Sequence, residues 1–237
     1  MGTDILHLAV VIEPQPDGIT CGPTCLHAVY RFHGLQLDLH AVIGAVTSLE
    51  DGGTLEVHLA CDALRRGFGA TIYTFNLNLF DPTWFIDPRT DIAAKLRLRA
   101  AHKRDAKFQF AVAGYCDFLA LGGRLRFTDL TRAQLRGMLR RGAPVIAGLN
   151  ATYLYRHARV SGPHDDPDDV QGEPCGHFVV LAGYNRGDRS IAVADPYLPN
   201  PVAAGQQYWV HIDRVIGAVL LGVMTYDASL LIVDRES

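Results

Sequence analysis

Four residues of the kinds used in acyl-transfer catalysis are spread along the 237-residue chain: Gln15, Cys21, His177 and Asp195. Cys21 opens the stretch CGPTCLHAVYRFHG, which predicts a helix because its apolar residues recur on a helical period and Gly34 follows as a stop. A thiol attacks as thiolate, and thiol pKa values of about 8.5 fall at helix N-termini and beside an imidazolium. The position of Cys21 therefore predicts a nucleophile.

The base is expected from a distant part of the chain, because nucleophile and base meet in the fold and not along the sequence. His177 opens HFVVLAGYN, an apolar run typical of a strand, and Asp195 ends the next such run, SIAVAD, after a turn at NRGD. If the two runs pair as an antiparallel hairpin, the end of the second lies beside the start of the first. The pattern therefore predicts that Asp195 orients His177 and sets its tautomer.

Two donors for a substrate oxyanion are also predicted. Gln15 lies in the turn-forming stretch PQPDG just before Cys21, and we expect its side-chain amide and the Cys21 N–H to form an oxyanion hole. Gly22 and Gly176 adjoin the nucleophile and the base, and we expect both glycines to contribute to substrate binding by allowing close approach. This chemistry needs no metal and no other cofactor.

These motifs, QPDGITCGPTCLHAVYRFHG with Gln15 and Cys21 and GHFVVLAGYNRGDRSIAVADPY with His177 and Asp195, resemble the peptidase C39-like group of papain-like cysteine peptidases, which includes bacteriocin leader peptidases. The resemblance implies an α+β, papain-like fold: an N-terminal helical lobe carries the Cys and a C-terminal antiparallel β-sheet lobe carries the His and Asp. It also implies a peptide or peptide-like substrate.

The order of predicted elements agrees with that division into halves. The first half is mainly helical, with Thr54 as the expected N-cap of a second helix that ends at Gly67, and a strand over 70–75. The second half contains short β-rich runs separated by Gly, Asp, Asn or Pro, as in an antiparallel sheet. We expect one domain over 1–237, in which 76–130 is a helical insertion or a lid, since this segment is longer than in compact leader peptidases.

Composition excludes several classes of protein. The net charge of −3 comes with scattered basic residues, which argues against nucleic acid as a partner. No stretch approaches the ~18 apolar residues of a membrane span, and the N-terminal apolar run lacks the basic flank of a secretory signal. The odd number of cysteines, five, predicts free thiols and a cytoplasmic location. Nothing in the sequence predicts an oligomeric state.

Three alternatives remain open at this stage. The same triad serves acyltransferases and transpeptidases, in which an acceptor other than water resolves the thioester. A C39-like domain can also bind without catalysis. Finally, Cys21, Cys25, Cys175 and His177 have the ligand types of a structural zinc site, although that reading leaves Gln15 and Asp195 unexplained.

Overall fold

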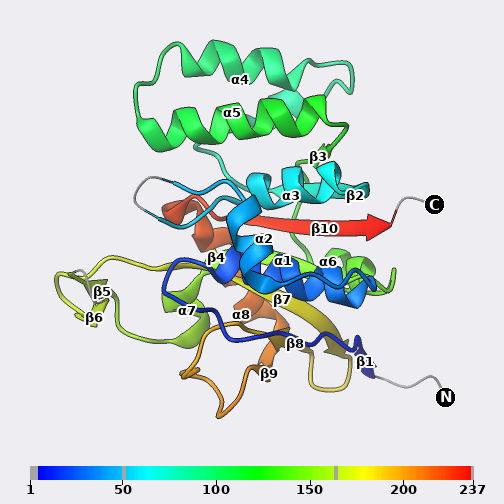
Figure 1. Ribbon diagram of the computed structural model, residues 1–237. Coiled ribbons are helices and arrows are strands. Elements are labelled where there is room, and N and C mark those ends of the chain that lie inside the picture. Colours follow the sequence, from blue (N-terminus) through cyan, green and yellow to red (C-terminus); the bar gives the residue numbers. More distant parts are fainter. Residues whose placement is uncertain (1–4, 50–51, 163–164, 236–237) are drawn as a thin grey trace.

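The computed structural model describes residues 5–49, 52–162 and 165–235 of the chain. Eight strands form one sheet in the order β3-β2-β10-β4-β7-β8-β9, with β1 paired to β7, and β5 and β6 form a separate small ribbon (Figure 1). The strands are β1 (Ile5–His7), β2 (Phe68–Thr74), β3 (Arg124–Arg126), β4 (Val145–Asn150), β5 (Val160–Ser161), β6 (Asp166–Pro167), β7 (Gly176–Asn185), β8 (Ser190–Ala194), β9 (Gln207–His211) and β10 (Ser229–Arg235).

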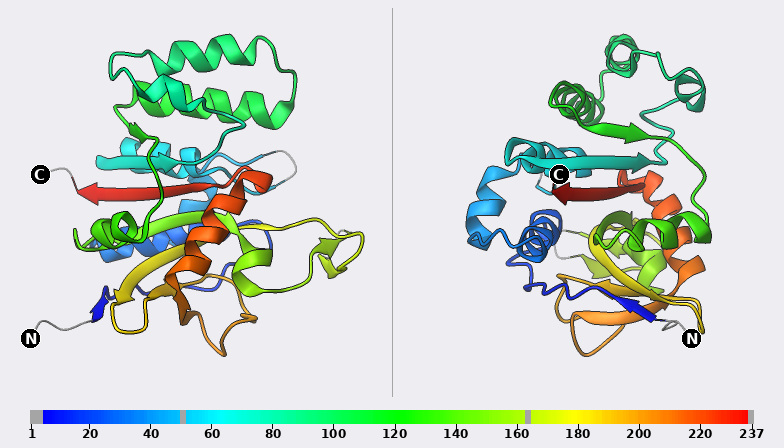
Figure 2. Two further views of the ribbon diagram at one scale, coloured as in Figure 1. Left: turned by 180° about the vertical axis from the view of Figure 1, so that it is seen from behind. Right: turned by 90° about the vertical axis from the view of Figure 1, so that its right-hand side faces the viewer.

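Helices cover both faces of this sheet. The α-helices are α1 (Cys21–Phe32), α2 (Leu39–Ala45), α3 (Glu56–Arg65), α4 (Ile92–Ala100), α5 (Ala106–Ala120), α6 (Arg132–Leu139), α7 (Ala151–Tyr155) and α8 (Ile212–Leu221), with 3-10 turns η1 (Pro82–Phe85) and η2 (Gly222–Thr225). The edge-on view shows α1 and α3 on one side and α6 and α8 on the other (Figure 2). One buried apolar cluster lies on each side of the sheet.

The predicted hairpin is confirmed. Strands β7 and β8 pair antiparallel, with Val180 opposite Ala194 and Asn185 opposite Ser190. Because helices cover both faces, the interior of β7 is buried throughout and has the continuous apolar sequence of such a strand instead of an alternating one. The register brings the residue that follows β8 next to the first residues of β7.

The predicted first helix is confirmed as α1, and Gly34 with φ +81° follows it, a backbone conformation that glycine adopts without strain. The Thr24 hydroxyl donates to Thr20 O at 2.8 Å in the first turn. Helix α1 packs on β7, where the buried Cys25 thiol donates to the Phe178 carbonyl at 3.3 Å. This contact fixes the N-terminus of α1 against the start of β7.

The predicted division into a helical and a β half is correct in outline, and the fold is a mixed α+β one with a largely antiparallel sheet. Two details differ. Strand β2, from the helical half, pairs with β10 of the β half, so both halves share one sheet. The prediction of Thr54 as an N-cap is wrong: α3 begins at Glu56 after Leu55, and the Thr54 hydroxyl donates instead to Thr47 O at 2.8 Å.

The segment 76–130 contains η1, α4, α5 and β3. Helix α5 contacts α3, and its Phe108, Tyr115 and Phe118 are buried in the same apolar cluster as α1. Helices α4 and α5 extend the molecule beyond α3, at the top of Figure 1. The segment is thus attached through its own buried aromatic side chains.

Candidate active site

His177 and Asp195 form a buried pair. His177 is the second residue of β7, Asp195 follows β8, and Nε2 of the histidine lies 2.9 Å from Oδ1 of the aspartate. The imidazole is 7% exposed and the carboxyl group is fully buried. Since the carboxylate occupies Nε2, the Nδ1 atom is the ring nitrogen that remains for the nucleophile.

Asp195 accepts hydrogen bonds from four donors. Besides His177, the Tyr197 N–H donates to Oδ1 at 3.0 Å, and the hydroxyls of Tyr155 and Tyr208 donate to Oδ2 at 2.8 and 2.6 Å. A buried carboxylate is stable only when its oxygens are satisfied in this way. The backbone of Asp195 is also fixed, because its N–H donates to Gln206 O at 2.8 Å.

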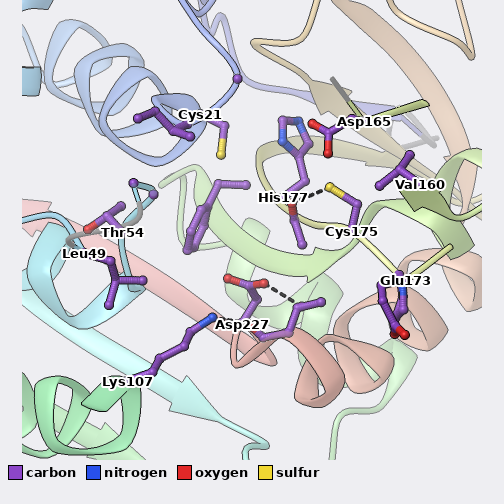
Figure 3. A pocket seen from close by; sticks show the side chains of 18 of the residues that line it. Cys21, Leu49, Thr54, Lys107, Val160, Asp165, Glu173, Cys175, His177 and Asp227 are labelled. Atoms are coloured by element: carbon purple, nitrogen blue, oxygen red, sulfur yellow. Dashed lines mark hydrogen bonds between the residues drawn. The ribbon is translucent and has the colours of Figure 1, made fainter. Parts of the chain in front are cut away.

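Cys21 is the first residue of α1 and lies across the cleft from His177 (Figure 3). The first N–H groups of a helix have no partner within the helix, and together with the dipole they favour negative charge there. Cys21 and His177 line the same cavity, and the charge of Cys21 is one of the causes that raise the pKa of His177. The structure therefore brings together the three residues predicted as a triad.

The electrostatics of the pair follow from burial and from charge. Burial alone lowers the pKa of His177, but Asp195 and Cys21 outweigh it and raise that pKa to about 10. Burial raises the pKa of Asp195, but the charge and hydrogen bond of His177 and the hydrogen bond of the Tyr208 hydroxyl lower it by more. The pKa of Asp195 is therefore below its ordinary value. At neutral pH the environment thus favours an imidazolium hydrogen-bonded to a carboxylate.

Gln15 lies on the same cleft as His177, in the loop before α1. Its backbone N–H donates to Pro196 O at 2.9 Å, which attaches this loop to the residue after Asp195. Its side-chain Nε2 donates to Asp17 O at 2.7 Å, leaving the second N–H of the amide for another acceptor. The predicted oxyanion donor is therefore next to the triad and partly engaged by its own loop.

The two predicted glycines differ in their surroundings. Gly22 is buried in α1, where a Cβ would lie 2.7 Å from Thr54 Cγ2 and 3.2 Å from Phe178, so close packing explains this glycine. Gly176 lines the cleft, and a Cβ there would lie 2.1 Å from Oδ2 of Asp227. Direct substrate contact by either glycine stays a prediction.

The cleft has two connected parts that share His177 and Cys175. The larger, about 660 Å³, contains Cys21 and Asp227. The smaller, about 250 Å³, contains Gln15 and is bounded by aromatic and proline side chains: Tyr155, Tyr197, Pro199 and Pro201. A chain-like substrate that crosses from one part to the other passes His177, which lines both parts.

The other thiols are placed differently from Cys21. Burial raises the pKa values of Cys25 and Cys116, and it raises those of Cys61 and Cys175 to about 11. Within the described ranges no group of three or more His, Cys, Asp or Glu residues is arranged to hold a metal ion, so the zinc alternative has no ligand set there. In the same ranges no helix has the length and apolar character needed to span a bilayer.

Sequence reasoning missed the residues that surround the triad. Tyr155 ends α7, and Tyr208 is an inward-facing residue of β9, whose buried and exposed positions alternate. The alternation in QYWVH predicts that Tyr208 faces inward, but not that it meets a carboxylate. Asp227 and Lys107, which also line the cleft, had no local signal.

One solved structure matches this fold along nearly its whole length. A putative C39-like peptidase from Bacillus anthracis superposes with a TM-score of 0.52 at 13% sequence identity, covering 98% of this chain and 98% of the other. The chain has the C39-like peptidase fold. Two further structures overlap less well: a double glycine motif protease from an AMS/PCAT transporter, in complex with the leader peptide (TM-score 0.49, 12% identity, 97% and 94% covered), and xylellain, a cysteine protease from Xylella fastidiosa (0.45, 14%, 99% and 87%).

The match is one of fold. No family model matches the sequence, and a search of curated proteins finds no match. The C39-like fold of this chain thus rests on the superposition, and its chemistry rests on the residues of the cleft.

Proposed function

We propose that the protein is a cysteine peptidase or amide hydrolase that cleaves a peptide or peptide-like substrate through an acyl-thioester on Cys21. The observation that carries the proposal is the buried His177–Asp195 pair, 2.9 Å between Nε2 and Oδ1, opposite a thiol at a helix N-terminus. The C39-like fold supports it, since the matching structure is named as a putative C39-like peptidase.

In the proposed reaction the proton of Cys21 has already passed to Nδ1 of His177, so the reacting pair is a thiolate and an imidazolium, and the sulfur attacks the carbonyl carbon of an amide. Asp195 keeps the ring in place and stabilises the imidazolium, because its carboxylate bonds Nε2. The imidazolium then gives its proton to the leaving amine as the carbon–nitrogen bond breaks. Water, activated by the same imidazole, hydrolyses the thioester and releases the acid.

The tetrahedral intermediate carries negative charge on the former carbonyl oxygen. The Cys21 N–H at the start of α1 and the second N–H of the Gln15 amide are the proposed donors. The backbone hydrogen bond from Gln15 to Pro196 supports this role, because it couples the donor's loop to the strand end that carries Asp195.

An extended peptide is the proposed substrate because two adjoining cavities meet at His177, one lined by Cys21 and the other by Gln15. Lys107, at the start of α5, lines the larger cavity, which supports a role for the segment 76–130 in shaping the cleft. All five cysteines are free thiols, which supports a reducing compartment such as the cytoplasm.

The test is selective alkylation of the native protein with iodoacetamide, followed by mass spectrometry of the labelled peptides. We expect Cys21 to react first, because burial raises the pKa values of the other four thiols, Cys25, Cys61, Cys116 and Cys175. His177→Ala is expected to slow labelling of Cys21. Preferential labelling of another thiol contradicts the proposal.

Activity is tested with a mixture of quenched fluorescent peptides. Cys21→Ala is expected to abolish cleavage, whereas the matched variant Cys175→Ala, in the same cleft, is expected to retain it. Cleavage that persists in Cys21→Ala refutes the mechanism. Adding a primary amine separates hydrolysis from acyl transfer, since a transferase forms the new amide and a hydrolase forms the free acid.

A further inference from the structure

The larger part of the cleft leads from the triad to a buried carboxylate. Cys21 and His177 lie at one end of this cavity of about 660 Å³, and Asp227 and Lys107 lie at the other (Figure 3). Asp227 takes no part in the proposed reaction, and its side chain is on the same continuous surface as the reacting sulfur. A substrate bound to Cys21 therefore has this carboxylate within its own binding cleft.

The turn between η2 and β10 holds Asp227 in place. Its N–H donates to Gly222 O at 2.9 Å, and its Oδ2 accepts the Thr225 hydroxyl at 2.6 Å. Tyr226, between them, has φ +72°, a left-handed conformation that a tyrosine rarely adopts. A bulky residue in this conformation at a binding cleft is consistent with a turn whose backbone positions the next residue, Asp227, toward the cleft.

The carboxylate lacks an ionic partner. Asp227 is only 7% exposed, yet within 5–49, 52–162 and 165–235 none of the ion pairs includes it. Lys107, the cation beside it, donates instead to Thr225 O at 3.2 Å and lies 5.1 Å from the centre of the Tyr226 ring. Burial raises the pKa of Asp227 to about 7, against the lowering influence of Thr225, Lys107 and His177.

We propose that Asp227 anchors a substrate subsite for a cationic side chain, lysine or arginine, at one position of the peptide that occupies this cavity. The inference rests on the proposed peptidase function and adds a substrate class to it. An ionised carboxylate only accepts hydrogen bonds, so ammonium and guanidinium groups are its natural partners. An apolar side chain would desolvate the carboxylate without supplying a hydrogen bond or an opposite charge to compensate.

The charge of the whole cavity agrees with a cation. Asp165 and Glu173 also line it, so three carboxyl groups face two cationic groups, the ammonium of Lys107 and the imidazolium of His177. Asp165 and Glu173 are exposed and contribute a long-range attraction, whereas Asp227 is buried and would make the direct contact. Lys107 opposes the bound cation, so the proposal predicts opposite effects for the loss of the two charges.

The experiment compares peptides that differ at one position at a time, with lysine or with norleucine, its apolar counterpart of similar length. For the wild-type protein we expect kcat/KM to favour lysine by about tenfold at one position. Asp227→Asn is expected to abolish that preference, and Lys107→Met to increase it. Asp165→Asn, at the exposed rim, is the matched control and is expected to change it by about twofold or less.

No preference for lysine at any position, or a preference that Asp227→Asn leaves intact, overturns the subsite. Lys107→Met gives an answer even if Asp227→Asn does not fold, because it leaves the carboxylate and its hydrogen bonds in place. A preference for lysine that decreases in Lys107→Met is evidence against the proposal.

A second measurement separates this proposal from the peptidase function. Methanethiosulfonate reagents modify Cys21 without any peptide cleavage, and the 2-aminoethyl and 2-sulfonatoethyl forms differ in charge. We expect the cationic reagent to react faster, and this advantage to decrease in Asp227→Asn. If the wild-type protein cleaves no peptide but reacts faster with the cationic reagent, and Asp227→Asn reduces that advantage, the subsite stands and the proposed reaction fails. Equal rates for both reagents refute the subsite.

Discussion

Replacing Tyr208 by phenylalanine removes one of the four hydrogen-bond donors of Asp195 and little else. The Tyr208 hydroxyl donates to Oδ2 at 2.6 Å, and its ring is packed in the apolar cluster on the α8 side of the sheet. Phenylalanine keeps that ring, so no cavity forms. The variant therefore isolates the interaction between a phenol and a buried carboxylate.

The expected loss follows from the type of hydrogen bond. A bond to a charged group contributes about 1.5–3 kcal/mol, and the carboxylate is fully buried, so water does not replace the missing donor. Tyr155 still donates to the same oxygen at 2.8 Å, which keeps the loss from exceeding this range. We expect the free energy of unfolding at pH 7 to decrease by about 2 kcal/mol.

The loss should depend on pH in one direction. The pKa of Asp195 is lowered in the folded protein, and the Tyr208 hydroxyl is one of the causes. A carboxyl group of this kind stabilises the fold above its unfolded pKa of about 3.9, and the contribution disappears as pH falls through the folded pKa. The difference between variant and wild type should be full above about pH 5 and smaller in more acidic solution.

The assay is urea unfolding at a series of pH values from neutral to the acid limit of the fold. Tyr73→Phe is the matched control, since Tyr73 packs against the same cluster but lines a different cavity, and a change within about 0.5 kcal/mol is expected for it. The reasoning is refuted if Tyr208→Phe lowers the free energy of unfolding no more than the control does, or if its effect is constant down to the acid limit. Either result means that the Tyr208 hydroxyl does not stabilise an ionised Asp195.

Three further results are expected. The raised pKa of His177, about 10, predicts that the stability supplied by its imidazolium is full below about pH 6.5 and is lost as pH rises through 10. In Asp195→Asn, both this loss of stability and the alkaline loss of peptide cleavage should occur at lower pH. Gly22→Ala should destabilise by about 1–3 kcal/mol in thermal or urea unfolding, because its Cβ meets packed atoms, whereas Gly18→Ala, with open space around it, should not. Gln15→Ala should lower kcat about a hundredfold with little change in KM if its amide serves the oxyanion, and an unchanged kcat excludes that role.

Much of the site could be predicted from the sequence because its central part is local. A strand, a four-residue turn and a second strand determine the β7–β8 register, and that register alone sets Asp195 beside His177. The helix that begins at Cys21 is equally local, since its apolar period and the stop at Gly34 are encoded within a few turns. Thr54 shows the limit of such reasoning: its type suits an N-cap, but its hydroxyl bonds Thr47 instead.

What only the tertiary structure decided is how the triad is surrounded. Tyr155 lies 40 residues from Asp195 along the chain, and Lys107 lies 118 residues from the Thr225 carbonyl that it binds. No periodicity or turn signal encodes such contacts, because they depend on which strands become neighbours and on which face each helix packs. The sequence by itself determined a nucleophile, a base and its orienting carboxylate, while the packing of the whole sheet decided which donors hold that carboxylate and which charges line the cleft.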